Sequence, residues 1–306
     1  MKTQRLQPLA LKDVLDYPIA PYNVARYISP ELGLVRSIEG MSDISSYIFV
    51  KGLPYRLTEG RVLYVRSGHA LARINLTENR VEAHQLRIVS PGAVIEFQEI
   101  SPDFDITMLA FANSFMENWQ REKLLSAYLQ GTADVLLRLD ETAEQRLEEV
   151  FTLMWNILQD NPSSYESIQG MISVLFHQIE YFQNRGLSGE KKTSTRQEEV
   201  FDRFIRLLNK HAVNERNVSF YAENLFLTPR YLSTLIKETS GKTVMEWVNE
   251  AIVQEAKLML CHTDKLVYQI ADELNFPNAS FFCKFFHRMT GKTPHGYRCD
   301  NRQKKP

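Results

Sequence analysis

The sequence predicts a chain of mixed α and β structure in several domains: antiparallel strands first, then a pair of helices, then a wholly helical C-terminal domain. Three observations predict this arrangement. Short runs rich in Val, Ile, Leu and Tyr alternate with turn residues over the first 110 residues. From about Ser114 onward, apolar residues recur at helical intervals. A polar, glycine-bearing stretch at 184–199 then precedes a C-terminal part with helical patterns throughout.

The strands are expected within residues 1–113. The runs RVLYVRSGHALARINLTEN and HQLRIVSPGAVIEF are punctuated by Ser-Gly, Glu-Asn and Pro-Gly, which is typical of antiparallel strands in a sandwich or small barrel. Arg73 and Glu96 are polar candidates for its interior, but a shift of one residue in register reverses the face of every side chain. The sequence therefore predicts no effector-binding residues.

Residues 114–184 are expected to form a helical segment with two amphipathic helices, separated at Asn161-Pro162. The apolar stripes are Leu147, Val150, Phe151, Met154 and Ile157 in the first helix, and Ile168, Met171, Ile172, Leu175, Ile179 and Phe182 in the second. The stripes either cover the sheet, which is favoured for one helix alone, or pair with a second copy of the chain. For the pair we favour a dimer seam, because a sheet of this size rarely needs two long helices. The linker is expected at 185–198 and the C-terminal domain at 199–306.

Charge is distributed unevenly along the chain. Residues 199–306 hold 16 Lys and Arg against 12 Asp and Glu, whereas the whole chain has a net charge of −1. A basic C-terminal domain favours a nucleic-acid-binding tail on a regulatory body. The sequence shows neither a long apolar span nor a cleavable leader, so no membrane partner is predicted and the cytoplasm is the expected compartment. Cys261, Cys283 and Cys299 lack zinc-type spacing and are expected to be reduced.

The tripeptide Gly-Lys-Thr occurs twice, at 241–243 and 291–293, and raises the question of a phosphate-binding loop. A nucleotide-binding loop needs a glycine five residues before the Gly-Lys pair, and Phe286 stands there. Instead, YLSTLIKETSGKTVMEW and FFCKFFHRMTGKTPHGY match in apolar pattern at an offset of 50 residues. The sequence thus predicts two similar units in tandem.

Each unit has the pattern of two short helices with a tight turn, the helix-turn-helix that reads DNA. The second helix is capped by Thr228, before Pro229, in the first unit and by Asn278 in the second unit. Thr243 and Glu246 form a capping box that opens a connecting helix of about eighteen residues. At about 1.5 Å per residue this helix spans roughly 27 Å, near the roughly 34 Å between successive major grooves on one face of DNA.

A helical wheel separates the two faces of each second, or recognition, helix. The inward faces are apolar: Leu232, Leu235 and Ile236, then Phe282 and Phe286. The outward faces carry Arg230, Tyr231, Thr234 and Lys237, then Ser280, Phe281, Lys284 and Arg288. These outward faces suit base edges, with Phe281 against a thymine methyl group, although a solvated basic face has the same composition. Gly241 and Gly291 are expected to end the helices, which leaves Lys242 and Lys292 to meet DNA phosphates.

Residues 200–298 resemble the DNA-binding domain of the AraC/XylS family. The family signature ends in GF-x-x-x-S-x-F-x-x-x-F-K-x-x-x-G-x-(T/S)-P-x-x-(Y/F)-R, and the chain has NFPNASFFCKFFHRMTGKTPHGYR. The resemblance implies an N-terminal cupin-like β barrel that acts as a sensor, a helical pair for dimerisation, and two helix-turn-helix motifs joined by a long helix. It also implies base contacts by Arg230, Ser233 and Thr234, and by Ser280, Phe281 and Lys284.

The chain departs from the family pattern at four positions. Asn275 replaces a glycine in the second turn, which is tolerable because Asn enters the left-handed conformation more easily than other non-glycine residues. Ile252, Ile236 and His287 replace the family's usual arginine, phenylalanine and lysine. These changes leave the expected fold intact, but no inherited contact is carried over at Ile252 of the connecting helix or at His287.

A cupin-like sheet can also belong to an enzyme if it holds a metal. Cupin metal sites use an H-x-H pair with further Glu and His ligands, but His69 and His84 are isolated and His177 is expected to be packed on an apolar helix or at its edge. G-x-S-x-G, C-x-x-C and H-E-x-x-H are absent as well. The sequence predicts no catalytic residue, metal or cofactor. A metal-free cupin-like enzyme or a sugar-binding module, with the C-terminal domain as an accessory interaction domain, is the alternative.

The favoured interpretation is a cytoplasmic, dimeric, sequence-specific transcription regulator that binds double-stranded DNA in two adjacent major grooves per chain. The resemblance adds a small-molecule effector in the N-terminal domain and RNA polymerase as further partners. The plainer interpretation of the barrel is that its own side chains fill it.

Overall fold

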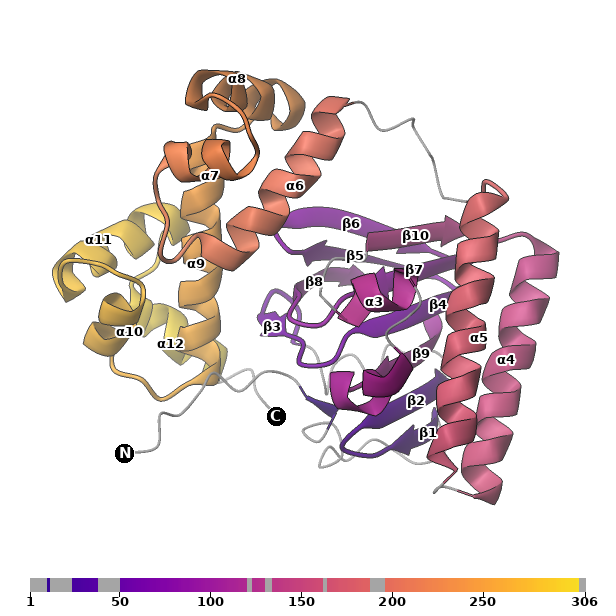
Figure 1. Cartoon of the computed structure of the whole chain (residues 1–306). Coiled ribbons are helices and arrows are strands. Elements are labelled where there is room, and N and C mark those ends of the chain that lie inside the picture. The colour runs from indigo at the N-terminus through magenta and orange to yellow at the C-terminus, as the bar shows by residue number, and fades with distance from the viewer. Residues whose placement is uncertain are drawn as a thin grey trace. The chain divides into compact units, whose positions relative to one another are not determined.

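Two structural units make up the chain in this computed structural model (Figure 1). The structure describes residues 10–11, 24–37, 50–119, 123–129, 134–161, 164–187 and 196–302. One unit holds most of residues 8–191 and the other holds residues 192–306. Within the described ranges, no helix is both long and apolar enough to span a membrane.

The first unit contains two sheets, and the strand pairs of known register are antiparallel. The larger sheet has the order β1-β2-β9-β4-β7-β10: Val24–Ile28, Leu32–Ser37, Asp105–Phe111, Arg61–Ser67, Gln85–Val89 and Asp134–Arg138. The smaller sheet has the order β3-β8-β5-β6: Pro54–Arg56, Val94–Ile100, His69–Ile74 and Thr77–Glu82. The predicted antiparallel β domain is confirmed, whereas its cupin-like character rests on the resemblance and stays a prediction.

Alternation along the strands gives the first unit two cores. On β4, Val62 and Tyr64 join the apolar cluster shared with the helices. Val65 and the partly buried Leu63 instead pack with Phe97 of β8, in a cluster drawn from both sheets. Successive side chains on a strand point to opposite faces, so one strand serves both cores.

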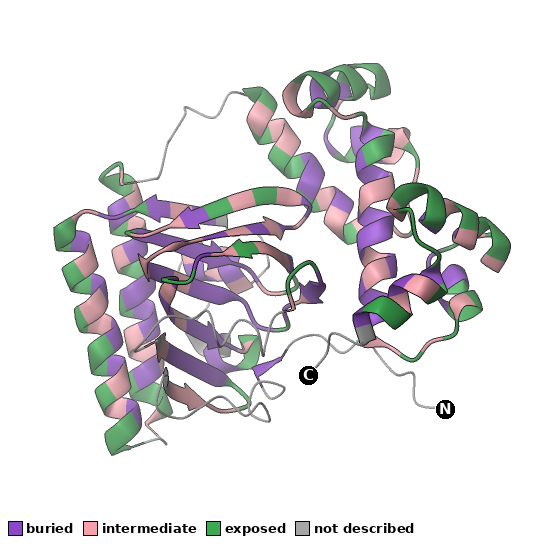
Figure 2. Cartoon of the chain, turned by 180° about the vertical axis from the view of Figure 1, so that it is seen from behind, coloured by how far each residue is buried: buried purple, intermediate pink, exposed green. Residues whose placement is uncertain are grey.

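Helices α4 (Glu141–Asp160) and α5 (Tyr165–Asn184) cover the larger sheet. Phe151 of α4 and Phe176 of α5 are buried in the same cluster as Leu34 and Leu86 of the sheet, and both helices show a buried stripe in Figure 2. The argument that this sheet has no need of two long helices is therefore wrong. Dimerisation of the chain stays a prediction, but these apolar stripes are already occupied.

Strand β10 corrects the expectation that 114–184 is helical. The segment does contain the 3-10 helix η1 (Asn113–Trp119) and α3 (Lys123–Leu129), but Asp134–Arg138 returns to the larger sheet and pairs with β7. Val135 and Leu137 are buried, in the alternation of a strand. Five residues between helical stretches are too few for that alternation to stand out.

The second unit is helical. Its helices are α6 (Arg196–His211), α7 (Val218–Asn224), α8 (Pro229–Ser240), α9 (Val244–His262), α10 (Val267–Glu273), α11 (Ala279–Thr290) and α12 (Pro294–Arg302). Central α9 contacts α6 and α8 as well as α10, α11 and α12 (Figure 1). Ile252 of α9 and Ile236 of α8 are buried. These two of the four departures from the family pattern therefore add to this core.

Candidate nucleic-acid interface

The first motif consists of α7 and α8, and its second helix starts and stops where the sequence predicts. Thr228 Oγ1 accepts a hydrogen bond from the backbone N–H of Tyr231 at 3.2 Å, and Pro229 occupies the first turn. Gly241 has a φ of +73°, and its N–H donates to the carbonyl of Lys237 at 2.9 Å. Each of these signals lies within one turn of an end of α8.

The second motif, α10 and α11, repeats this design. Asn278 Oδ1 accepts from the N–H of Phe281 at 3.1 Å, and Gly291 closes the helix with a φ of +72°. Phe282 and Phe286 are fully buried, as the wheel predicts. In the first motif the corresponding residues Leu232 and Ile236 are buried too, and so is Leu235.

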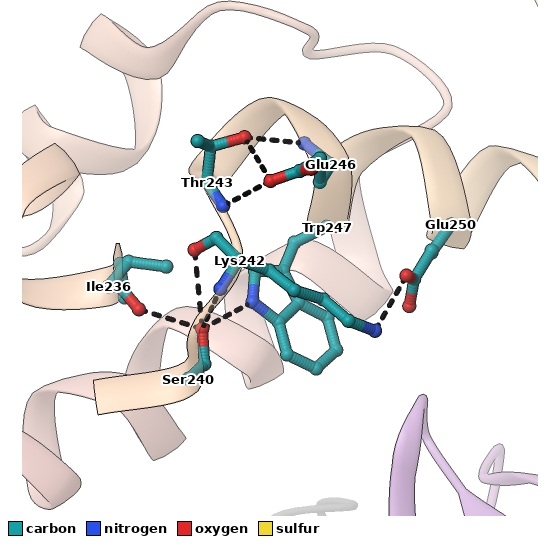
Figure 3. A network of polar contacts seen from close by, with 7 residues as sticks. All are labelled: Ile236, Ser240, Lys242, Thr243, Glu246, Trp247 and Glu250. Atoms are coloured by element: carbon teal, nitrogen blue, oxygen red, sulfur yellow. Dashed lines mark hydrogen bonds and ion pairs between the residues drawn. The ribbon is translucent and has the colours of Figure 1, made fainter. Parts of the chain in front are cut away.

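A joint of the same construction follows each recognition helix, and Figure 3 shows the first. Ser240 Oγ donates to the carbonyl of Ile236 at 2.7 Å and lies 3.3 Å from the N–H of Lys242. In the second joint, Thr290 Oγ1 donates to the carbonyl of Phe286 at 2.7 Å and lies 3.3 Å from the N–H of Lys292. The repeated Gly-Lys-Thr is therefore a helix stop and restart.

The N-terminus of α9, the helix that follows the first joint, is stabilised by a capping box. Thr243 Oγ1 accepts from the N–H of Glu246 at 3.2 Å, and the Glu246 carboxylate accepts from the N–H of Thr243 at 2.6 Å. That backbone donor holds the pKa of Glu246 below its usual value. The predicted box is confirmed, and it sets the direction in which α9 leaves α8.

Both joint lysines are held by carboxylates of their own domain. Lys242 Nζ lies 2.6 Å from Glu250 Oε1 and 4.6 Å from the centroid of the Trp247 ring. Lys292 Nζ lies 2.6 Å from Asp300 Oδ2. In each case the acid stands eight residues after the lysine. Phosphate contacts by these lysines stay a prediction. Each contact requires the lysine either to leave its carboxylate or to contact the carboxylate and a phosphate at the same time.

The remaining residues predicted to contact DNA are exposed: Arg230, Tyr231, Ser233, Thr234 and Lys237 on α8, Ser280, Phe281, Lys284 and Arg288 on α11, and Lys292 beyond it. Within the described part of the chain, Arg230 and Lys284 form no ion pair through their side chains. Arg288 lies over the Phe285 ring at 5.7 Å. Arg230, in the first turn of α8, and Lys284, midway along α11, are thus cations without an ion-pair partner among the described residues.

A hollow of about 290 Å³ lies at the start of α11. It is lined by Asn278, Ala279, Ser280, Phe281 and Lys284. The Phe281 side chain is 59% exposed, and Tyr231, at the same position of α8, is 51% exposed. Both recognition helices thus expose one aromatic ring in their first turn.

Sequence reasoning missed a direct bridge between the two motifs. The Arg216 guanidinium, before α7, lies 4.4 Å from the ring of Phe276, in the turn of the second motif, and donates to the Leu274 carbonyl. Asn275 Nδ2 in the same turn donates to the Val213 carbonyl at 3.2 Å. Burial lowers the pKa of Arg216. The sequence did not predict this contact, because nothing around Arg216 distinguishes it from an arginine exposed to solvent.

The turn of the first motif holds a second feature that sequence reasoning missed. Phe226 has a φ of +58° and is 89% exposed, although a bulky residue is unfavourable in the left-handed region and an apolar one is unfavourable in water. Its counterpart is Asn275, with a φ of +54°, as the sequence predicts for that position. One motif therefore carries a suitable residue in its turn and the other a strained one.

The histidines weighed for a metal site lie apart and face carboxylates. His69 Nε2 lies 3.2 Å from Glu99 Oε1, and His84 Nδ1 lies 2.6 Å from Glu144 Oε1. His177 is exposed on α5, with its Nδ1 3.9 Å from Glu180 Oε2, so a place in the core is excluded. Within the described ranges, no group of three or more His, Cys, Asp or Glu side chains could hold a metal ion.

Comparison with known proteins points to one family. A family model described as a helix-turn-helix domain matches residues 221–299. The chain is 33% identical over 94 residues to the regulatory protein PocR of Salmonella typhimurium, which covers 31% of this chain and 31% of PocR. It is 23% identical over 259 residues to the transcriptional activator RhaR of Escherichia coli K12, covering 82% of this chain and 80% of RhaR. The match therefore spans less than a third of the length of PocR but most of RhaR.

A solved structure of ToxT from Vibrio cholerae is 13% identical, covers 81% of this chain and 92% of ToxT, and has a TM-score of 0.40. The family model is more informative, because residues 221–299 run from α7 into α12 and enclose both recognition helices. On its tandem motif and these matches, the C-terminal unit is a helix-turn-helix domain of the AraC type, and the relatives that the chain matches are transcription regulators.

Proposed function

We propose that this chain is a sequence-specific DNA-binding transcription regulator, with α8 and α11 each entering a major groove. The observation that carries the proposal is the repeated motif, in which both recognition helices bury one face and expose polar and basic residues on the other. Helices of this kind read base edges with the residues near their start. At 19 residues, α9 is about 28 Å long, which suits two neighbouring grooves on one face of DNA.

The exposed residues divide into two proposed roles. Arg230, Ser233 and Thr234 of α8, and Ser280, Phe281 and Lys284 of α11, contact bases. Lys237, Arg288, Lys242 and Lys292, together with the Tyr231 hydroxyl, contact the backbone. Base contacts supply specificity, and backbone contacts supply affinity that falls as salt rises.

The first unit is proposed to regulate DNA binding and not to catalyse a reaction. Support comes from the relatives, since PocR and RhaR are named as a regulatory protein and a transcriptional activator. A homodimer, a small-molecule effector bound by the first unit, contact with RNA polymerase and a cytoplasmic location complete the proposal. None of these rests on a particular residue of the sheets.

An electrophoretic mobility shift with the full chain tests the proposal. The probe is the DNA upstream of the protein's own gene, and the competitor is random DNA of equal length. We expect a shift that resists the competitor, weakens as salt rises, and is lost in the double variant Arg230→Ala/Lys284→Ala. Equal competition by random DNA at low salt would exclude a sequence-specific regulator.

A further inference from the structure

The two recognition helices differ in the hydrogen bonds that their exposed hydroxyls can offer. On α8, Ser233 Oγ donates to the Pro229 carbonyl at 2.8 Å, and Thr234 Oγ1 donates to the Arg230 carbonyl at 3.1 Å. A hydroxyl has one proton, so both present only lone pairs to a partner. They therefore match hydrogen-bond donors, and the donors at major-groove base edges are the amino groups of adenine and cytosine.

Helix α11 presents the opposite chemistry. The Lys284 ammonium is a donor with no ion-pair partner among the described residues, and Ser280 at the same face keeps its hydroxyl proton. The ammonium can only donate, and the Ser280 hydroxyl can donate as well as accept. Their match is an acceptor, such as N7 and O6 of guanine or O4 of thymine.

The hollow at the start of α11 adds an apolar requirement. Ala279 and the exposed Phe281 line it, together with Ser280 and Lys284. The 5-methyl group of thymine is the apolar group that bases present in the major groove. Covering an apolar ring with a methyl group removes both from water, which favours binding.

Given the proposed function, we infer that this hollow is a thymine-methyl site beside a guanine read by Lys284. The two halves of the DNA site are then chemically different. The half bound by α11 requires a thymine methyl group and base acceptors, whereas the half bound by α8 requires a base amino group next to the guanine that suits Arg230. A single chain consequently binds its site in one orientation.

Uracil substitution tests the inference, because uracil differs from thymine only by the missing methyl group. The full chain first selects its site from a random double-stranded library, and each thymine of that site is then replaced singly by uracil. We expect affinity to fall about four-fold at one or two thymines within one half of the site. Phe281→Ala should abolish this sensitivity, whereas Tyr231→Ala, at the equivalent position of α8, should preserve it.

The outcomes separate this inference from the function on which it rests. A library that yields no enriched sequence contradicts sequence-specific binding itself. An enriched site that tolerates uracil at every position, or that has no thymine in either half, overturns only the methyl site. Sensitivity that persists in Phe281→Ala overturns the role of that ring.

Discussion

The guanidinium of Arg216 lies 4.4 Å from the ring centroid of Phe276 and so joins the start of the first motif to the turn of the second. The same arginine donates to the Leu274 carbonyl. The motifs are thus connected twice, through α9 and through this direct contact. Two connections fix the relative placement of the recognition helices better than one, and fixed placement lowers the entropy lost on binding both grooves.

Replacing Arg216 by Ala should loosen the spacing between the two recognition helices. We expect affinity for a complete site to fall by roughly 1–2 kcal/mol, from a lost partly buried cation–π contact and a hydrogen bond to a charged group. The variant should also tolerate a base pair inserted between the halves better than the parent does, measured by fluorescence anisotropy. Arg206→Ala, which removes an exposed arginine from α6, is the control for charge. Equal affinities and equal tolerance of the insertion in the two variants would show that the Arg216–Phe276 contact plays no part in DNA binding.

Replacing Glu250 by Gln should release Lys242 from its ion pair. The pair is partly exposed, so the free energy of unfolding should change by no more than about 1 kcal/mol. If free Lys242 reaches a phosphate, the slope of log affinity against log salt steepens by about 0.9. Asp272→Asn makes the same charge change on α10, at a side chain that forms no ion pair with the described residues. A slope that changes equally in both variants would show that only net charge matters.

Replacing Lys284 by Ala should cost about 1–3 kcal/mol of binding free energy and relax preference at a few base pairs in one half of the site. The reason is the loss of a donor aimed at base acceptors. Probes that each carry one base-pair change measure this preference by competition. Lys292→Ala, a proposed phosphate contact, should weaken all probes alike. Equal weakening of all probes by Lys284→Ala would show that Lys284 contacts the DNA backbone and not a base.

Replacing Phe286 by Ala should destabilise the second unit by about 3–5 kcal/mol. The ring is fully buried and lies 5.8 Å from the ring of Phe282 and 5.6 Å from that of Tyr297, so its removal leaves a cavity. Urea unfolding followed by circular dichroism measures the loss. Phe281→Ala should stay within about 0.5 kcal/mol of the parent because that ring is exposed. Equal stability of the two variants would contradict the wheel.

Replacing Phe226 by Gly should stabilise the second unit. Removing a side chain from a residue with positive φ should stabilise the fold by roughly 1–2 kcal/mol. The larger backbone entropy that Gly has in the unfolded chain offsets about half of this gain. Phe226→Ala is the matched control, since it removes the ring but keeps Cβ in the left-handed region. Thermal unfolding should rank Gly above Ala. A Gly variant less stable than the parent would mean that the ring is covered by a partner in solution.

Local signals predicted the helical unit well. Caps, terminal glycines and the faces of α8 and α11 depend on residues within one or two turns, so Thr228, Asn278 and Gly291 could be read directly from the chain. Phe226 escaped notice because the second turn is one residue longer than the first. At the offset of 50 that aligns the helices, Phe226 falls opposite Phe276 and not opposite its true counterpart Asn275.

Features that depend on distant partners could not be predicted. The ion pairs of Lys242 and Lys292 form only because α9 and α12 bring an acid back beside the joint. Strand β10 forms because it pairs with β7 at the edge of the larger sheet. Its five residues are too few to show the periodicity of a strand by themselves. The stripes of α4 and α5 were recognised, but the size of the sheet that they cover was not visible in the sequence.

The identical joints after α8 and α11 make the two motifs a head-to-tail repeat within one polypeptide. A dimer with twofold symmetry reads a palindrome, in which neither direction along the DNA is preferred. A head-to-tail repeat instead meets two different half-sites that run in the same direction, so a single bound chain has a front and a back. For a regulator this means that reversing the site in place should reverse the order in which α8 and α11 meet the promoter, even when affinity is unchanged.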